Sequence, residues 1–196
     1  MMFRTRVDGL WPLLVLCCAL SSACGGGALS QQRDREALRR ESSLHELIAR
    51  GNASAQIGDM IRAEQYFVSA QKAGGNEREL VRRLLVVCTA DQRYPAAAEY
   101  AERYLHRHPG DVDLRFAAAS IQAAVGETRR ARELLDTVLR ERPDWAEAHY
   151  ALASMMRADG EPLSLADQHD LQYLKLNPHG TLAETARARL ARRGTP

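Results

Sequence analysis

Apolar and polar positions follow a helical period over most of the chain. In the segment 126–143, apolar side chains recur every three or four residues and charged side chains fill the positions between them; the apolar set is Ala131, Leu134, Leu135, Val138 and Leu139. The same spacing returns in the segment 97–105. This pattern places the apolar side chains on one face of an α-helix. No window shows the sustained period-two alternation that is typical of strands, so the pattern predicts an all-α protein.

The segment 126–143 also recurs at intervals of 34 residues. The recurring positions are a glycine, an alanine and a closing proline: Gly58, Gly126 and Gly160; Ala63, Ala97 and Ala131; Pro109 and Pro143. A glycine suits the end of a helix because it leaves the helical conformation at little steric cost, and a proline cannot continue a helix. A fixed period in this range indicates stacked supersecondary units.

With this period and these positions, the chain resembles the tetratricopeptide repeat family, whose unit is a 34-residue helix–turn–helix. The resemblance implies a right-handed superhelix of about four repeats, at 44–77, 78–111, 112–145 and 146–179, with a capping helix at 181–193. Gly51 takes the small position at which two helices cross. Two features depart from the family pattern. Gln92 stands where the second repeat should have its glycine, and the fourth repeat needs one extra residue before Ala166.

Helix starts are expected near the repeat boundaries. Three pairs each combine a capping side chain with an acidic residue three positions later: Asn76 with Glu79, Asp144 with Glu147, and Thr181 with Glu184. In such a pair the first side chain accepts a backbone hydrogen bond and the acid reaches back. The terminal helix must have a wettable outer face, and its arginines suit a solvated cap.

The N-terminus has the pattern of an export signal. Arg4 and Arg6 precede an apolar run at 10–23, which is shorter than the roughly 20 residues needed to cross a bilayer. We therefore expect a signal peptide at 1–23. The residues that end this run resemble a bacterial lipoprotein signal, in which Cys24 becomes the lipidated first residue; Leu20, however, stands four residues before the Cys rather than three. The alternative is plain secretion after Ala23.

The residues that follow connect this signal to a single domain at 34–196. Residues 24–33 include three glycines and little to bury, so we expect a flexible tether. The charged segment 34–50 is either one long helix that continues into the first repeat or a short helix that stops near Ser42. Ser43 followed by Glu46 favours a fresh start.

Charge and cysteine content exclude several classes of function. The whole chain has 27 basic and 25 acidic residues, and this near balance gives no basic face for nucleic acid. Only one of the four cysteines, Cys88, falls among the repeats, so it cannot form an intramolecular disulfide there. It takes a position where the family packs a large apolar side chain, which predicts a buried, inert thiol.

No catalytic or metal-binding constellation is recognisable in the sequence. His106 and His108 are two residues apart and point to different faces of a helix. His169 and Asp170 are expected on a mostly polar surface, and no glycine-rich phosphate loop is found. We therefore expect a non-enzymatic protein without metal or cofactor.

Binding is better supported. In the family, set positions of each first helix face a concave groove. The residues at these positions that can anchor a partner are Asn52, Arg82, Val86, Phe116, Tyr150 and Arg157. Aromatic residues and Arg commonly anchor contacts of this kind. Val86 could instead pack a neighbouring repeat, and the apolar pattern of the third repeat could turn Phe116 out of the groove, with Arg115 and Gln122 in its place. Of the residues with which family members grip a C-terminal carboxylate, only Asn52 matches.

The sequence thus predicts an exported scaffold of the bacterial cell envelope that binds a partner polypeptide, anchored through Cys24 at the periplasmic face of the outer membrane. The resemblance to lipoproteins of this layout implies a role in pilus biogenesis, secretion or outer-membrane assembly. The alternatives are a self-associating structural protein and a binding subunit of an envelope enzyme or transporter.

Overall fold

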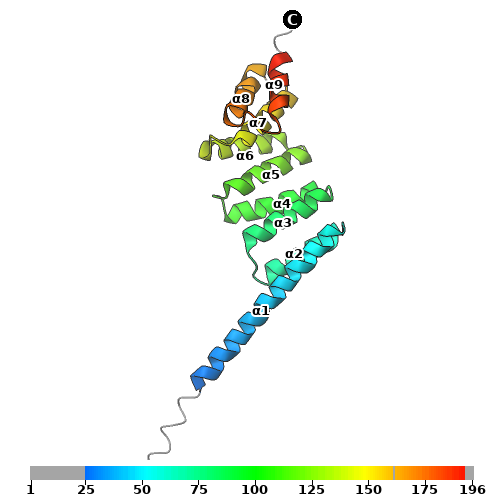
Figure 1. Ribbon diagram of the computed structural model, residues 1–196, viewed down its shortest axis with the longest axis vertical. Coiled ribbons are helices and arrows are strands. Elements are labelled where there is room, and N and C mark those ends of the chain that lie inside the picture. The colour runs from blue at the N-terminus through cyan, green and yellow to red at the C-terminus, as the bar shows by residue number, and fades with distance from the viewer. Residues whose placement is uncertain (1–24, 161, 193–196) are drawn as a thin grey trace, which may run out of the picture. The chain divides into compact units, whose positions relative to one another are not determined.

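The computed structural model describes residues 25–160 and 162–192, and in these residues every regular element is a helix (Figure 1). The helices are α1 (Gly25–Gln56), α2 (Met60–Lys72), α3 (Glu77–Ala90), α4 (Tyr94–Arg107), α5 (Val112–Val125), α6 (Thr128–Glu141), α7 (Ala146–Ala158), α8 (Leu163–Leu176) and α9 (Ala183–Ala191). The chain divides into two units, Met1–His45 and Glu46–Pro196. In the second unit, each helix from α2 to α9 packs on the next one in chain order. The predicted all-α class is confirmed.

The second helix of each pair buries the side chains that the repeat pattern singles out. Each of these helices presents small residues and one or two large ones to its neighbours; the buried set is Ala63, Phe67 and Ala70 in α2, Ala97, Ala101 and Tyr104 in α4, Ala131, Leu135 and Val138 in α6, and Ala166 and Tyr173 in α8. The last two positions fit only with the extra residue expected before Ala166. The small alanines allow the helix backbones to approach closely, and the large side chains fill the space that remains between adjacent helices.

Gly51 marks the crossing of α1 and α2. A Cβ atom added to Gly51 would lie 2.5 Å from Cε1 of Phe67, whose side chain is only 2% exposed. A side chain at position 51 would therefore have to displace the buried Phe67 ring. A residue without a side chain is therefore required at this contact.

The first helices α1, α5 and α7 are each followed by a glycine with positive φ. Helix α3 is followed by a residue with positive φ that is not a glycine. Gly58, Gly126 and Gly160 have φ values of 83°, 93° and 71°, and Gln92 has a φ value of 57°. Gln92 thus adopts the left-handed conformation that the repeat pattern assigns to glycine. After α3, the N–H of Arg93 donates to the carbonyl oxygen of Cys88 at 2.8 Å, which completes a Schellman-type helix end.

The predicted helix starts are confirmed at one position and wrong at two. Asn76 caps α3 by accepting a hydrogen bond from the Glu79 N–H, although the Glu79 carboxylate pairs with Arg83 instead of reaching back. Trp145 and Leu182, rather than Asp144 and Thr181, occupy the caps of α7 and α9. The N–H of Leu182, at the start of α9, donates to the hydroxyl oxygen of the buried Tyr173.

The N-terminal segment also differs from expectation. The tether predicted at 24–33 is not found in the described residues, because α1 begins at Gly25 and continues without interruption to Gln56. The helix neither stops near Ser42 nor starts afresh at Ser43; the Ser42 hydroxyl donates to the carbonyl oxygen of Arg39, a hydrogen bond compatible with the middle of a helix. Leu, Ala, Gln, Arg and Glu, which are good helix formers, dominate the sequence on both sides of this serine. The signal at 1–23 and Cys24 lie outside the described residues.

Among the described helices, none has the length and apolar content that a membrane span requires.

Candidate functional site

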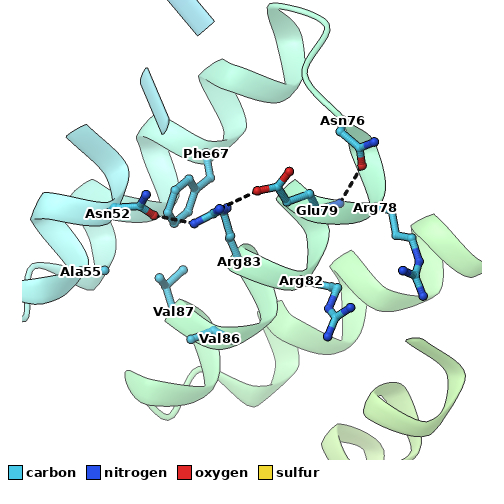
Figure 2. A pocket seen from close by; sticks show the side chains of 10 residues that line it. All are labelled: Asn52, Ala55, Phe67, Asn76, Arg78, Glu79, Arg82, Arg83, Val86 and Val87. Carbon is cyan, nitrogen blue, oxygen red and sulfur yellow. Dashed lines mark hydrogen bonds and ion pairs between the residues drawn. The ribbon is translucent and has the colours of Figure 1, made fainter. Parts of the chain in front are cut away.

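The open face of α3 borders a hollow of about 610 Å³. Figure 2 shows its lining, which comes from the C-terminal part of α1, from α2, from α3 and from the residue that caps α3: Asn52, Ala55, Phe67, Asn76, Arg78, Glu79, Arg82, Arg83, Val86 and Val87. A second hollow of about 220 Å³ lies between α3 and α5, and Arg78, Arg82 and Val86 border both. We call the two hollows together the α3 groove.

The sequence of α3 explains why this face is open. Leu80, Val81, Leu84, Leu85, Val87 and Cys88 are buried against the neighbouring helices. Glu79, Arg82 and Val86 recur at the three-and-four spacing of the opposite face. Arg82 is exposed, and the Val86 side chain is 65% exposed although it is apolar. An apolar side chain is thus presented to solvent one helical turn from a cation.

Arg83 joins α1 to α3 at the base of the groove. Its Nη1 donates to Oδ1 of Asn52 at 2.7 Å, and its Nη2 donates to Oε1 of Glu79 at 2.5 Å (Figure 2). Its guanidinium carbon lies 5.9 Å from the centroid of the Phe67 ring. Arg83 therefore holds Asn52 in place and neutralises Glu79.

Arg78 is neutralised as well. Its Nε donates to Oδ2 of Asp111 at 2.6 Å, and its Nη2 donates to Oδ2 of Asp113 at 2.9 Å. Asp111 also accepts from the hydroxyl of Tyr104 and from the N–H of Leu114, so it links α3, α4 and the start of α5. The Arg78 guanidinium, above all, together with these other donors, lowers the pKa of Asp111 to about 2.

Arg82 differs from its two neighbours. Among the described residues, its guanidinium makes no hydrogen bond or ion pair, and no dashed line reaches it in Figure 2. The carboxylate of Asp113 is shared between Arg78 and Arg142, whose Nη1 lies 3.0 Å from Oδ1. The α3 groove therefore has one positive charge that the surrounding side chains do not balance.

Part of the repeat segment matches a known family. Residues 89–155 match the family model "Tetratricopeptide repeat". The structure of a tetratricopeptide repeat protein from Parabacteroides merdae is similar, with a TM-score of 0.68 at 24% sequence identity, over 78% of this chain and 61% of that one. The chain has a tetratricopeptide repeat fold.

Other solved structures agree with this fold. The protein YrrB, described as a tetratricopeptide repeat protein with an unusual peptide-binding site, has a TM-score of 0.63 at 21% identity, over 83% of this chain and 88% of that one. MamA from Desulfovibrio magneticus, residues 41 to the end, has a TM-score of 0.61 at 18% identity, over 79% and 96%. The chain spans less than two thirds of the Parabacteroides protein. No curated protein sequence matches the chain.

The tetratricopeptide repeats bring only three of the six predicted groove residues together. Asn52, Arg82 and Val86 border the same hollow. Phe116 is half-buried and packs on Trp145, with ring centroids 4.6 Å apart. Tyr150 packs on Tyr173 at 5.4 Å. These two aromatic side chains fill space between helices of the stack.

The third residue outside the groove, Arg157, belongs to a buried ionic cluster. Its Nη2 lies 2.6 Å from Oδ2 of Asp170 and 2.7 Å from Oδ1 of Asp167. Arg189 of α9 approaches Asp170 from the other side at 3.5 Å. Asp170 is completely buried, so the expected polar surface around it is wrong. The cluster joins α7, α8 and α9, and it leaves Arg157 without the free guanidinium expected of a groove residue.

Arg115 and Gln122 do not replace Phe116 in the groove. Both are buried; Arg115 pairs with Glu141 at 2.6 Å, and Gln122 donates to Glu102 at 2.9 Å. The first bond lies within the third repeat, and the second joins it to the second repeat. The alternative that α5 is rotated to expose them is therefore wrong.

The remaining candidates for chemistry have structural environments. Cys88 is fully buried, and burial raises the pKa of its thiol to about 11, which agrees with the predicted inert thiol. His108 lies 2.9 Å from Glu77 and stacks on Tyr104. His149 and His169 meet through their Nδ1 atoms at 2.9 Å. In the described residues, no three His, Cys, Asp or Glu side chains are grouped so that they could hold a metal ion.

Sequence reasoning missed Arg83. It stands next to Arg82 on the same helix and has the same side chain, but it reaches α1 whereas Arg82 does not. The signal that could have found it was Glu79 four residues earlier, an arrangement that favours an ion pair along a helix.

Proposed function

We propose that this chain is a non-enzymatic interaction scaffold that binds a partner polypeptide in the α3 groove. The observation that carries the proposal is the presence of the exposed Val86 beside the unbalanced Arg82. A side chain such as Val86 gains free energy when a partner covers it, at about 25 cal/mol for each Å² of apolar surface. YrrB, which shares the fold, is described as having a peptide-binding site, and this agrees with such a role.

The groove suits an elongated ligand better than a small molecule. The two hollows share three residues and extend from α1 past α3 to α5. Among the described residues, the only carboxylates that line them, Glu79 and Asp113, are each paired with arginine, and the lining includes no histidine, serine or cysteine. This lining offers binding groups and lacks an acid–base pair or a nucleophile.

Site-specific photo-crosslinking in the native cells tests this proposal. A photoreactive amino acid at Val86 is expected to give a discrete adduct with a partner polypeptide. Val125 is the matched control, because it is an exposed valine at the end of α5 that borders neither hollow. Equal adduct yields from the two positions, or none from position 86, would refute binding in the groove.

We also propose that the scaffold acts in the bacterial cell envelope, held by a lipid on Cys24 at the periplasmic face of the outer membrane. The support comes from the basic start, the short apolar run and the small residues before Cys24. Pilus biogenesis, secretion and outer-membrane assembly are the processes that fit an anchored scaffold. A tagged fatty acid should label the wild-type chain and not Cys24→Ser; equal labelling of both would refute the anchor.

A further inference from the structure

We infer that the α3 groove recognises an extended peptide segment in which an acidic side chain and an aliphatic side chain, two residues apart, contact Arg82 and Val86. This inference rests on the proposed function and adds the chemical class of the partner. The acid is the side chain of an Asp or Glu within the partner segment.

The charges around the groove determine the sign of the partner. Three arginines of α3 line it, and two of them have carboxylate partners: Arg83 pairs with Glu79, and Arg78 pairs with Asp111 and Asp113. Arg82 has none in the described part of the chain, although it borders both hollows. A carboxylate placed against Arg82 completes the pairing, whereas a cation would meet an uncompensated positive charge.

The apolar surface beside Arg82 determines the second contact. Val86 is 65% exposed, and Ala55, Ala117 and buried Val87 continue the apolar lining on either side of it. None of these four side chains can form a hydrogen bond, so a polar ligand group placed here would lose its bonds to water without replacement. An aliphatic side chain makes no hydrogen bonds to water that it would lose here, and it would bury Val86.

The separation of the two anchors determines the spacing in the ligand. Arg82 and Val86 are four residues apart on α3, which corresponds to about 6 Å along the helix axis. In an extended peptide, side chains two residues apart point the same way and lie about 6.6 Å apart, so they match this distance. Adjacent side chains point to opposite sides and cannot contact both anchors.

Fluorescence anisotropy with the purified full chain and labelled peptides tests the inference. The first peptide is N-acetylated and C-amidated, with a Glu and a Leu two residues apart in a Ser/Gly background, so that its only carboxylate is a side chain. The second has Lys in place of Glu, and the third has Glu and Leu adjacent. The first is expected to bind about fivefold more tightly than the second, the order of magnitude of an exposed ion pair, and this preference should shrink in high salt.

Two variants make the test specific to the groove. Arg82→Glu is expected to reverse the preference in favour of the Lys peptide, and Val86→Ser should weaken both peptides equally. Arg129→Glu is the control, because Arg129 is an exposed arginine on α6 outside the groove, and the preference should survive this change.

The outcomes separate this inference from the proposed function. Equal binding of the Glu and Lys peptides, an unchanged preference in Arg82→Glu, equal binding of the adjacent-residue peptide, or no binding of any peptide would each overturn the inference. An adduct at position 86 alongside any of these results would leave the proposed scaffold function standing with a ligand of different chemistry. A peptide that binds only when its C-terminus is left as a free carboxylate would also overturn the inference, because the acid would then be the chain end.

Discussion

Replacing Gln92 with glycine should stabilise the protein. Gln92 has a φ value of 57° at the end of α3, where an L-residue with a Cβ atom pays roughly 1–2 kcal/mol for the left-handed conformation. Glycine removes this cost but makes the unfolded chain more flexible, which offsets about 0.4–1 kcal/mol. The Gln92 side chain is exposed, so little contact is lost. The net gain in the free energy of unfolding is about 0.5–1 kcal/mol, or a rise of roughly 1–4 °C in Tm for a chain of this length.

Urea unfolding followed by circular dichroism measures this gain. The midpoint should rise in Gln92→Gly while the m value stays the same, because the area exposed on unfolding does not change. Gln92→Ala is the first control, since alanine retains the Cβ atom and should unfold at nearly the parent midpoint. Gly126→Gln is the second; its φ value is 93° and no atom lies within 4 Å of an added Cβ, so it should lose about what Gln92→Gly gains. A Gln92→Gly variant no more stable than Gln92→Ala would contradict the assignment of the cost to φ.

Three further changes probe the core, the ionic cluster and the histidine pair. Leu135→Ala should lower the free energy of unfolding by about 2–5 kcal/mol, because Leu135 is fully buried and leaves a cavity; urea titration measures the loss. Asp170→Ala should cost about 1–3 kcal/mol, because the Arg157 guanidinium loses its closest carboxylate in a buried site but keeps Asp167, and Asp170→Glu should recover part of this in the same titration. Burial, and then the neighbouring His149, lower the pKa of His169, so the unfolded state binds the proton first as the pH falls. The contribution of His169 to stability should be complete above about pH 6.5 and should decrease below it. Thermal melting across this range should show a weaker dependence of Tm on pH for His169→Gln than for the wild type.

The fold was predictable from the sequence because it depends on short-range periodicity. Ala63 belongs to a set of alanines that recurs every 34 residues, and Leu135 lies on the apolar face of its helix. The burial of both therefore follows from the pattern. Gln92 was noted in the sequence only as a departure from the pattern, and the structure shows that it adopts the positive φ of the glycines at this position in the other repeats. Such features depend on one helix pair at a time, and each repeat supplies an independent copy of the signal.

The candidate site was only partly predictable, because its geometry depends on side chains from different repeats. Arg82 and Arg83 are adjacent residues of the same type, and the placement of α1 decides which of them bonds to Asn52. Asp170 is charged and was expected at the surface, yet arginines from α7 and α9 neutralise it in the interior. Its burial depends on partners that are 13 and 19 positions away along the chain.

Asp111 contributes both to the packing of two neighbouring repeats and to the charge of the α3 groove. One carboxylate caps α5, receives the Tyr104 hydroxyl and neutralises Arg78 at the edge of the groove. Losing it would loosen the junction between two repeats and leave Arg78, beside Arg82, with Asp113 as its remaining carboxylate partner. A substitution at position 111 would therefore change the stability of the repeat junction and the charge of the groove together.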